Sequence, residues 1–100
     1  MTRQVSGRIV ITHNVGLHAR PSVKLTKLAK GFVADIEISS DPQGPWIDAK
    51  SIVKVMAMKV KQHSTLYVRA SGTDAASAVE TLISLVSRDF DEAVADAAGP

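Results

Sequence analysis

The feature that most constrains the fold is the spacing between apolar residues. This spacing changes along the chain from every second residue to every third or fourth residue, and then back again. Residues 34–38 read "ADIEI" and residues 65–70 read "TLYVRA", so apolar and polar side chains alternate in both segments. Such alternation is typical of strands with one face on a core and the other in water. The β-branched run at residues 8–12 predicts another strand, in which Ile9 and Ile11 share a face.

Between these strands, apolar residues recur at helical spacing. One stripe predicts a helix from about Ala19 to Gly31, in which a proline is tolerated because the first turn needs no N–H there. Its members are Pro21, Leu25, Leu28, Ala29 and Phe32. Residues 48–61 lack Gly and Pro and predict a second helix, apolar nearly all round. A third helix is expected to begin at a Thr73 or Asp74 cap and run to Phe90.

Turn-forming residues fill positions 39–45, "SSDPQGP", and the apolar pair at 46–47 predicts a brief returning strand. The order is therefore β-α-β-β-α-β-α. This order predicts an α+β fold in which helices cover one face of an antiparallel sheet. A chain of 100 residues supports one core, so we expect a single domain over residues 1–90 and a frayed tail over residues 91–100.

Charge and cysteine content narrow the possible partners. The formal net charge is only +2 and the 12 Lys and Arg are spread along the chain, which argues against nucleic acid. There is no cysteine, and the three histidines lack metal-ligand spacing, so we expect no metal and no cofactor. No window approaches the roughly 18 apolar residues of a membrane span, and no signal peptide is evident. These features favour a cytoplasmic protein without membrane insertion.

The stretch "VGLHARPS", residues 15–22, places His18 at the N-cap of the first predicted helix. A helix N-terminus presents unpaired N–H groups and a positive dipole end, which together receive a phosphate. The dipole also favours the neutral imidazole, whose lone pair can attack phosphorus. Arg20 suits phosphate oxygens. The sequence thus predicts a phosphate-facing histidine; the alternative is a plain helix cap beside an ordinary surface cation.

The motif "GLHARPS", with "DAKSIVKVM" at residues 48–56, resembles HPr, the histidine-containing phosphocarrier family of the bacterial phosphotransferase system. The likeness covers roughly Val5 to Phe90. It implies an open-faced β-sandwich of four antiparallel strands with three helices on one side. It also implies a monomeric carrier, not an enzyme: His18 receives a phosphoryl group on its δ1 (pros) nitrogen from enzyme I and passes it to an enzyme IIA domain. Arg20 would steady that group.

The resemblance further implies an apolar docking patch beside the histidine. Its members would be Ala19, Val23, Ile52, Val53 and Met56. Val55 and Met58 would enter the core instead. The alternative is that all of these side chains are core residues, although a helix covered on every side is rare in so small a domain.

Ser51 matches the serine that an HPr kinase/phosphatase modifies in many family members. A phosphate of roughly −2 charge is tolerated at a helix start but spoils an adjacent apolar surface. Ser51 can also be a simple N-cap. A second functional hypothesis is a regulatory binding module of the same fold, in a nitrogen-linked branch, which acts through its phosphorylation state. The segment "SSDPQGPWID", residues 39–48, is longer than is usual in the family.

Overall fold

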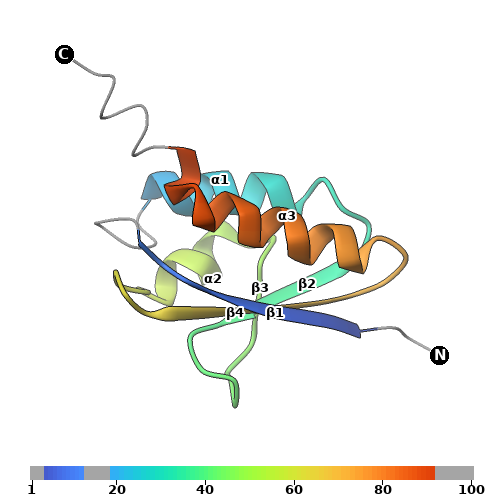
Figure 1. Ribbon diagram of the computed structural model, residues 1–100, viewed down its shortest axis with the longest axis horizontal. Helices are drawn as coiled ribbons and strands as arrows, with labels where there is room; N and C mark the ends of the chain where they lie inside the picture. The colour runs from blue at the N-terminus through green and yellow to red at the C-terminus, as the bar shows by residue number, and fades with distance from the viewer. Residues whose placement is uncertain (1–3, 13–18, 92–100) are drawn as a thin grey trace.

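The computed structural model describes residues 4–12 and 19–91. Three helices lie on one face of a four-stranded antiparallel sheet, and the other face is open (Figure 1). The strands are β1 (Gln4–Val10), β2 (Asp35–Ser39), β3 (Ile47–Asp48) and β4 (Thr65–Ser71), in the spatial order β1-β4-β2-β3. The helices are α1 (Ala19–Ala29), α2 (Ile52–Ala57) and α3 (Ala75–Ser87), followed by the 3-10 turn η1 (Asp89–Asp91). The predicted fold class is confirmed.

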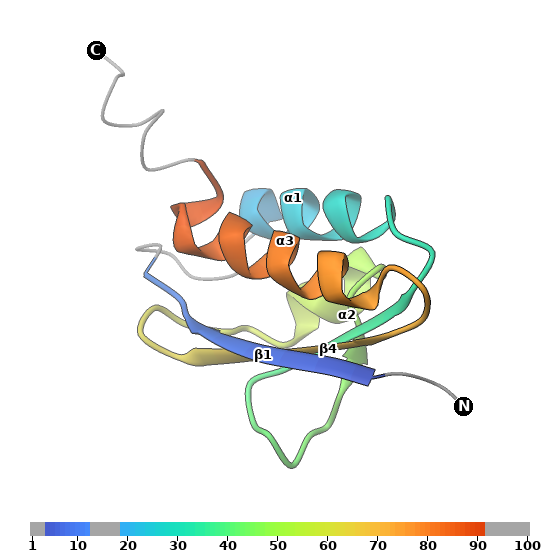
Figure 2. The same ribbon diagram turned by 45° about the vertical axis from the view of Figure 1, so that its right-hand side comes forward.

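The core lies between the sheet and the three helices, and the alternation of apolar and polar residues in the strands determines which strand side chains enter it. Leu66, Val68 and Ala70 of the central strand β4 are buried, whereas Tyr67 and Arg69 between them reach the open face. Ile36 and Ile38 of β2 pair with Ala70 and Val68 and extend the same apolar layer. Helix α3 crosses this layer, in contact with β1, β4 and β2 (Figure 2). It buries Ala78, Leu82 and Val86 completely.

The predicted bounds of two elements, the first strand and the third helix, are wrong. The first strand begins four residues earlier, at Gln4, because its whole length pairs with β4, and it ends at Val10 instead of Thr12. The third helix ends at Ser87 and not at Phe90, since Asp89 and Phe90 adopt left-handed φ values of 53° and 58°. Phe90 is nevertheless completely buried, which explains why it continues the apolar stripe.

The second helix was predicted to be too long: it spans six residues, Ile52–Ala57, instead of residues 48–61. At its start, Asp48 belongs to β3 and pairs with Glu37, and the Ala49 N–H donates to the Ile36 carbonyl. At its end, Lys59 takes a φ of 52°, which a continuing helix does not allow. Strand pairing before the helix and a left-handed residue after it therefore shorten the helix, although the apolar run contains no Gly or Pro.

Asp74 precedes α3 as expected, but its side chain does not cap that helix. Its carboxylate accepts hydrogen bonds from the Val33 N–H at 2.9 Å and the Ala34 N–H at 2.7 Å, across 40 residues of chain. The Val33 bond holds the pKa of the Asp74 carboxyl below its ordinary value; the Ala34 N–H and Lys50 act in the same direction, against partial desolvation. Asp74 thus joins the loop before β2 to the turn before α3.

Candidate functional site

The first turn of α1 begins at Ala19, the position that the sequence predicts. Ala19 and Arg20 are exposed, whereas Pro21 and Ser22 are buried, so the turn is anchored on one side and open on the other. His18 and Gly16 lie outside the described residues. Within the described chain Arg20 has no ion-pair or hydrogen-bond partner, and its guanidinium is available to an incoming anion.

The five predicted docking residues lie on two neighbouring helices, because α1 packs against α2. Val23 is 51% exposed, Met56 42% and Val53 75%, while Ala19 is also exposed and Ile52 is half-buried. The alternative in which all five are core residues is therefore wrong for Val23, Val53 and Met56. Exposed apolar side chains on adjacent helices form a surface suited to a partner. Their docking role stays a prediction.

The remaining apolar positions of this region enter the core. Val55 is completely buried, and Met58, just after α2, packs against the core while partly exposed. Both agree with the sequence expectation. One face of α2 therefore holds the helix on the domain and the other presents Val53 and Met56, which accounts for a helix that looks apolar nearly all round.

Ser51 is the N-cap residue of α2. Its backbone is extended, with φ −105° and ψ 108°, and its hydroxyl accepts a hydrogen bond from the Lys54 N–H at 3.4 Å. The distance is at the long end for a hydrogen bond, so the cap contributes little. The residue is half-buried next to Ile52 and Val53. A charge at Ser51 would stand at the edge of the predicted docking patch.

Lys24 has a role that the sequence did not reveal. Periodicity places it on the wet side of α1, but its ammonium donates a 2.8 Å hydrogen bond to the Phe90 carbonyl of η1. This bond spans 66 residues and connects α1 to the buried Phe90 of η1. No local pattern signals such a contact, because its acceptor is a backbone carbonyl 66 residues away along the chain.

Residues 4–12 and 19–91 contain no group of three or more His, Asp or Glu side chains that could hold a metal ion. Over the same residues, none of the helices is long and apolar enough to cross a membrane.

Comparison with known proteins connects this chain to the HPr proteins in both sequence and structure. A family model described as the PTS HPr component phosphorylation site matches residues 5–88. Phosphocarrier protein HPr of Cupriavidus necator is 39% identical over 82 residues, which cover 82% of this chain and 90% of that protein. Phosphocarrier protein NPr of Escherichia coli K12 is 31% identical over 88 residues, which cover 88% of this chain and 97% of that protein.

Among solved structures, HPr-C-His from Thermoanaerobacter tengcongensis matches with a TM-score of 0.80 and 29% identity, over 87% of this chain and 96% of that one. Phosphocarrier protein HPr from Bacillus anthracis matches with a TM-score of 0.77 and 34% identity, over 83% of this chain and 96% of that one. Sequence and fold therefore agree that this is a phosphocarrier of the phosphotransferase system. The chain belongs to the HPr family.

Proposed function

We propose that His18 accepts a phosphoryl group from phosphorylated enzyme I and passes it to an enzyme IIA domain. One observation carries the proposal: α1 begins at the residue directly after His18, in a chain that matches the family's phosphorylation-site model over residues 5–88. A helix N-terminus stabilises a phosphate through its unpaired N–H groups and its dipole. A residue at this position can therefore hold the group without a metal ion or cofactor.

The chemistry follows from a neutral imidazole. Its δ1 lone pair attacks phosphorus, a phosphorus–nitrogen bond forms, and the bond between phosphorus and the donor breaks. Transfer to the acceptor repeats the step in reverse. Arg20 is exposed and unpaired among the described residues, so its guanidinium can bind the phosphoryl oxygens before and after transfer. In this proposal the protein is a covalent intermediate that has no turnover of its own and acts as a single-domain monomer in the cytoplasm.

The docking patch of Ala19, Val23, Ile52, Val53 and Met56 receives enzyme I and the IIA domain in turn. Three of these side chains, Val23, Val53 and Met56, are exposed apolar groups on α1 and on α2, the helix that packs against it. Ser51 stands next to Val53, so its phosphorylation by an HPr kinase/phosphatase would bring a charge of about −2 to the patch and weaken docking.

A second candidate function is a regulatory module of the nitrogen-linked branch. The observation that favours it is the similarity to phosphocarrier protein NPr over 88% of the chain. Transfer of label from the phosphorylated protein to a panel of IIA domains distinguishes the two functions. Preference for a sugar-linked IIA domain supports the first, and preference for a nitrogen-linked IIA domain supports the second.

The test of the carrier role is labelling with enzyme I, Mg²⁺ and radioactive phosphoenolpyruvate. We expect an acid-labile, base-stable label on the wild-type protein and none on His18→Ala. His63→Ala is the matched control, because His63 is an exposed loop histidine that should leave labelling unchanged. Arg20→Ala should slow transfer while the melting temperature stays within about 1 °C, since an unpaired surface cation contributes little to folding. Full labelling of His18→Ala would refute the assignment.

A further inference from the structure

The open face of the sheet carries a groove that the carrier chemistry does not use. Its volume is about 410 Å³. It is lined by Gln4, Ser6, Gly7, Arg8, Pro42, Trp46, Tyr67 and Arg69. The loop before β3, which contributes Pro42 and Trp46, lies on the side of the sheet away from the three helices in both views (Figures 1 and 2).

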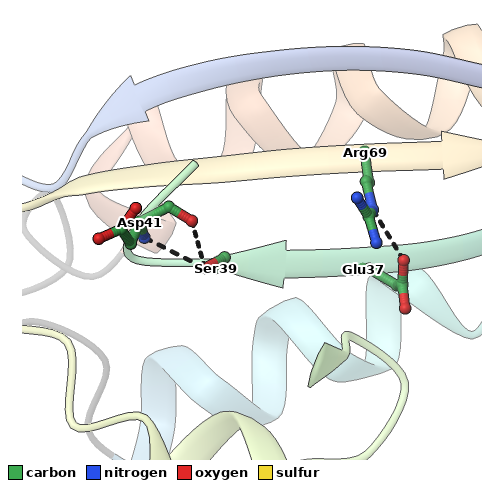
Figure 3. A network of polar contacts seen from close by, with 4 residues as sticks. All are labelled: Glu37, Ser39, Asp41 and Arg69. Atoms are coloured by element: carbon green, nitrogen blue, oxygen red, sulfur yellow. Dashed lines mark hydrogen bonds and ion pairs between the residues drawn. The ribbon is translucent and has the colours of Figure 1, made fainter. Parts of the chain in front are cut away.

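One wall of the groove is Trp46, held in place by a chain of contacts. The Arg69 Nε donates to the Glu37 carboxylate at 2.8 Å across β4 and β2 (Figure 3). The same guanidinium lies 4.1 Å from the centroid of the Trp46 ring, a cation–π contact. Glu37 therefore fixes Arg69, and Arg69 fixes the indole over the sheet.

The loop that carries Trp46 is held in one conformation by hydrogen bonds of its own. The Ser39 hydroxyl donates to the Asp41 carbonyl at 2.6 Å and accepts from the Asp41 N–H at 3.1 Å (Figure 3). The Gly44 N–H donates back to the Asp41 carbonyl at 2.8 Å. Gly44 has a φ of 92°, and a Cβ there would lie 3.1 Å from the indole, so the turn that leads into Trp46 requires glycine. The groove is thus preformed.

The opposite wall comes from alternate residues of β1. Gln4, Ser6 and Arg8 point to the open face, and Arg8 pairs in register with Tyr67 on β4. The Arg8 guanidinium is exposed and has no acidic or hydrogen-bonding partner among the described residues. Arg69, by contrast, is already paired with Glu37.

The lining therefore combines two guanidinium groups, two aromatic rings and no carboxylate. Asp35 shares the open face but does not line the groove. An unpaired guanidinium favours an oxyanion, and arginine binds phosphate oxygens through two parallel N–H groups. Aromatic rings favour a planar partner. The volume falls within the range of small-molecule sites and is too large for a bare anion.

We propose that this groove binds a small aromatic phosphate of the size of a nucleoside monophosphate. The phosphate lies on Arg8, and the planar ring lies against Trp46 and Tyr67. Because β1, β4 and the Trp46 loop form the site on the face opposite the helices, a ligand there leaves the first turn of α1 accessible. The groove gives the carrier a second binding function that is independent of phosphoryl transfer.

The test uses AMP as the probe and the chain's single tryptophan, Trp46, as the reporter. We expect a saturable change in Trp46 fluorescence, with half-saturation below about 1 mM, and a matching shift of the Trp46 indole N–H in NMR spectra. Arg8→Gln should raise the Kd at least about tenfold, since it removes the only unpaired cation of the lining. Lys30→Gln, which removes an exposed cation on the helical side, should leave the Kd unchanged.

Two partial ligands separate the elements of the proposal. Adenosine lacks the phosphate and ribose 5-phosphate lacks the ring, and each should bind at least about tenfold more weakly than AMP. Equal binding by either one, or saturation by an acidic peptide and not by AMP, overturns the proposal. His18→Ala should still bind AMP, and Arg8→Gln should still accept label from enzyme I. Failure of the groove and failure of the carrier role are therefore distinguishable.

Discussion

Val53→Ser separates the contribution of one side chain to folding from its contribution to docking. Val53 is 75% exposed, so folding gains only about a quarter of the roughly 1.5–3 kcal/mol that full burial of a valine gives. The free energy of unfolding should therefore fall by about 0.4–0.8 kcal/mol. Serine and valine have similar helix propensities, so the helix itself adds no large cost.

The exposed three-quarters of Val53 is available to a partner. Complete coverage by enzyme I would be worth about 1.1–2.2 kcal/mol, which corresponds to a rise of roughly 6- to 40-fold in the KM for this protein as a substrate of enzyme I. Steady-state phosphoryl transfer, with urea unfolding of the same samples, measures both quantities. Val33→Ser is the matched control, because Val33 is 82% exposed but lies beyond the C-terminal end of α1. An unchanged KM for Val53→Ser, or an equal rise for Val33→Ser, refutes the docking patch.

Three further changes test other contacts. Ser51→Asp should slow uptake from enzyme I at least about tenfold, because the carboxylate stands beside the patch, while stability changes by less than about 0.5 kcal/mol, since aspartate is as good an N-cap as serine; normal uptake would remove the regulatory role. Thr26→Val should raise the free energy of unfolding by about 1 kcal/mol in urea titrations, because the buried Thr26 hydroxyl has no hydrogen-bond partner among the residues that the structure describes; destabilisation would show that the hydroxyl is satisfied. The lowered pKa of Asp74 means that its ionised form stabilises the fold above the ordinary carboxyl value of 3.8, and that this contribution is lost as the pH falls through the lower folded-state pKa. Asp74→Asn should therefore be less stable than wild type at pH 7, and the difference should shrink in acid; a pH-independent difference would contradict this.

Periodicity was sufficient to predict the sheet, because alternation in residues 34–38 and 65–70 reflects burial on one face. It failed at α2, where the apolar run that suggests a 14-residue helix hides a strand, a turn and a left-handed residue. These are tertiary effects: Asp48 is extended because Glu37 is its partner, and no local pattern contains that partner. The Asp74 carboxylate was mispredicted for the same reason. It accepts a hydrogen bond from a loop 40 residues away instead of capping its own helix.

The start of α1 was predictable because a proline and a helical stripe fix it locally. The exposure of Val53 beside the buried Val55 was not derivable from apolarity alone, since both are valines on one short helix. The groove on the open face also escaped sequence reasoning. Its signal was present in the outward Tyr67 and Arg69 of β4 and in a tryptophan at the end of the loop between β2 and β3, but only the fold brings them together.

The most direct test of the central claim is ³¹P and ¹⁵N NMR of the protein after incubation with enzyme I and phosphoenolpyruvate. The account predicts one new phosphohistidine resonance, coupled to the δ1 nitrogen of His18 and absent from the His18→Ala variant. A phosphoryl group on another residue, or on the ε2 nitrogen of His18, would contradict it.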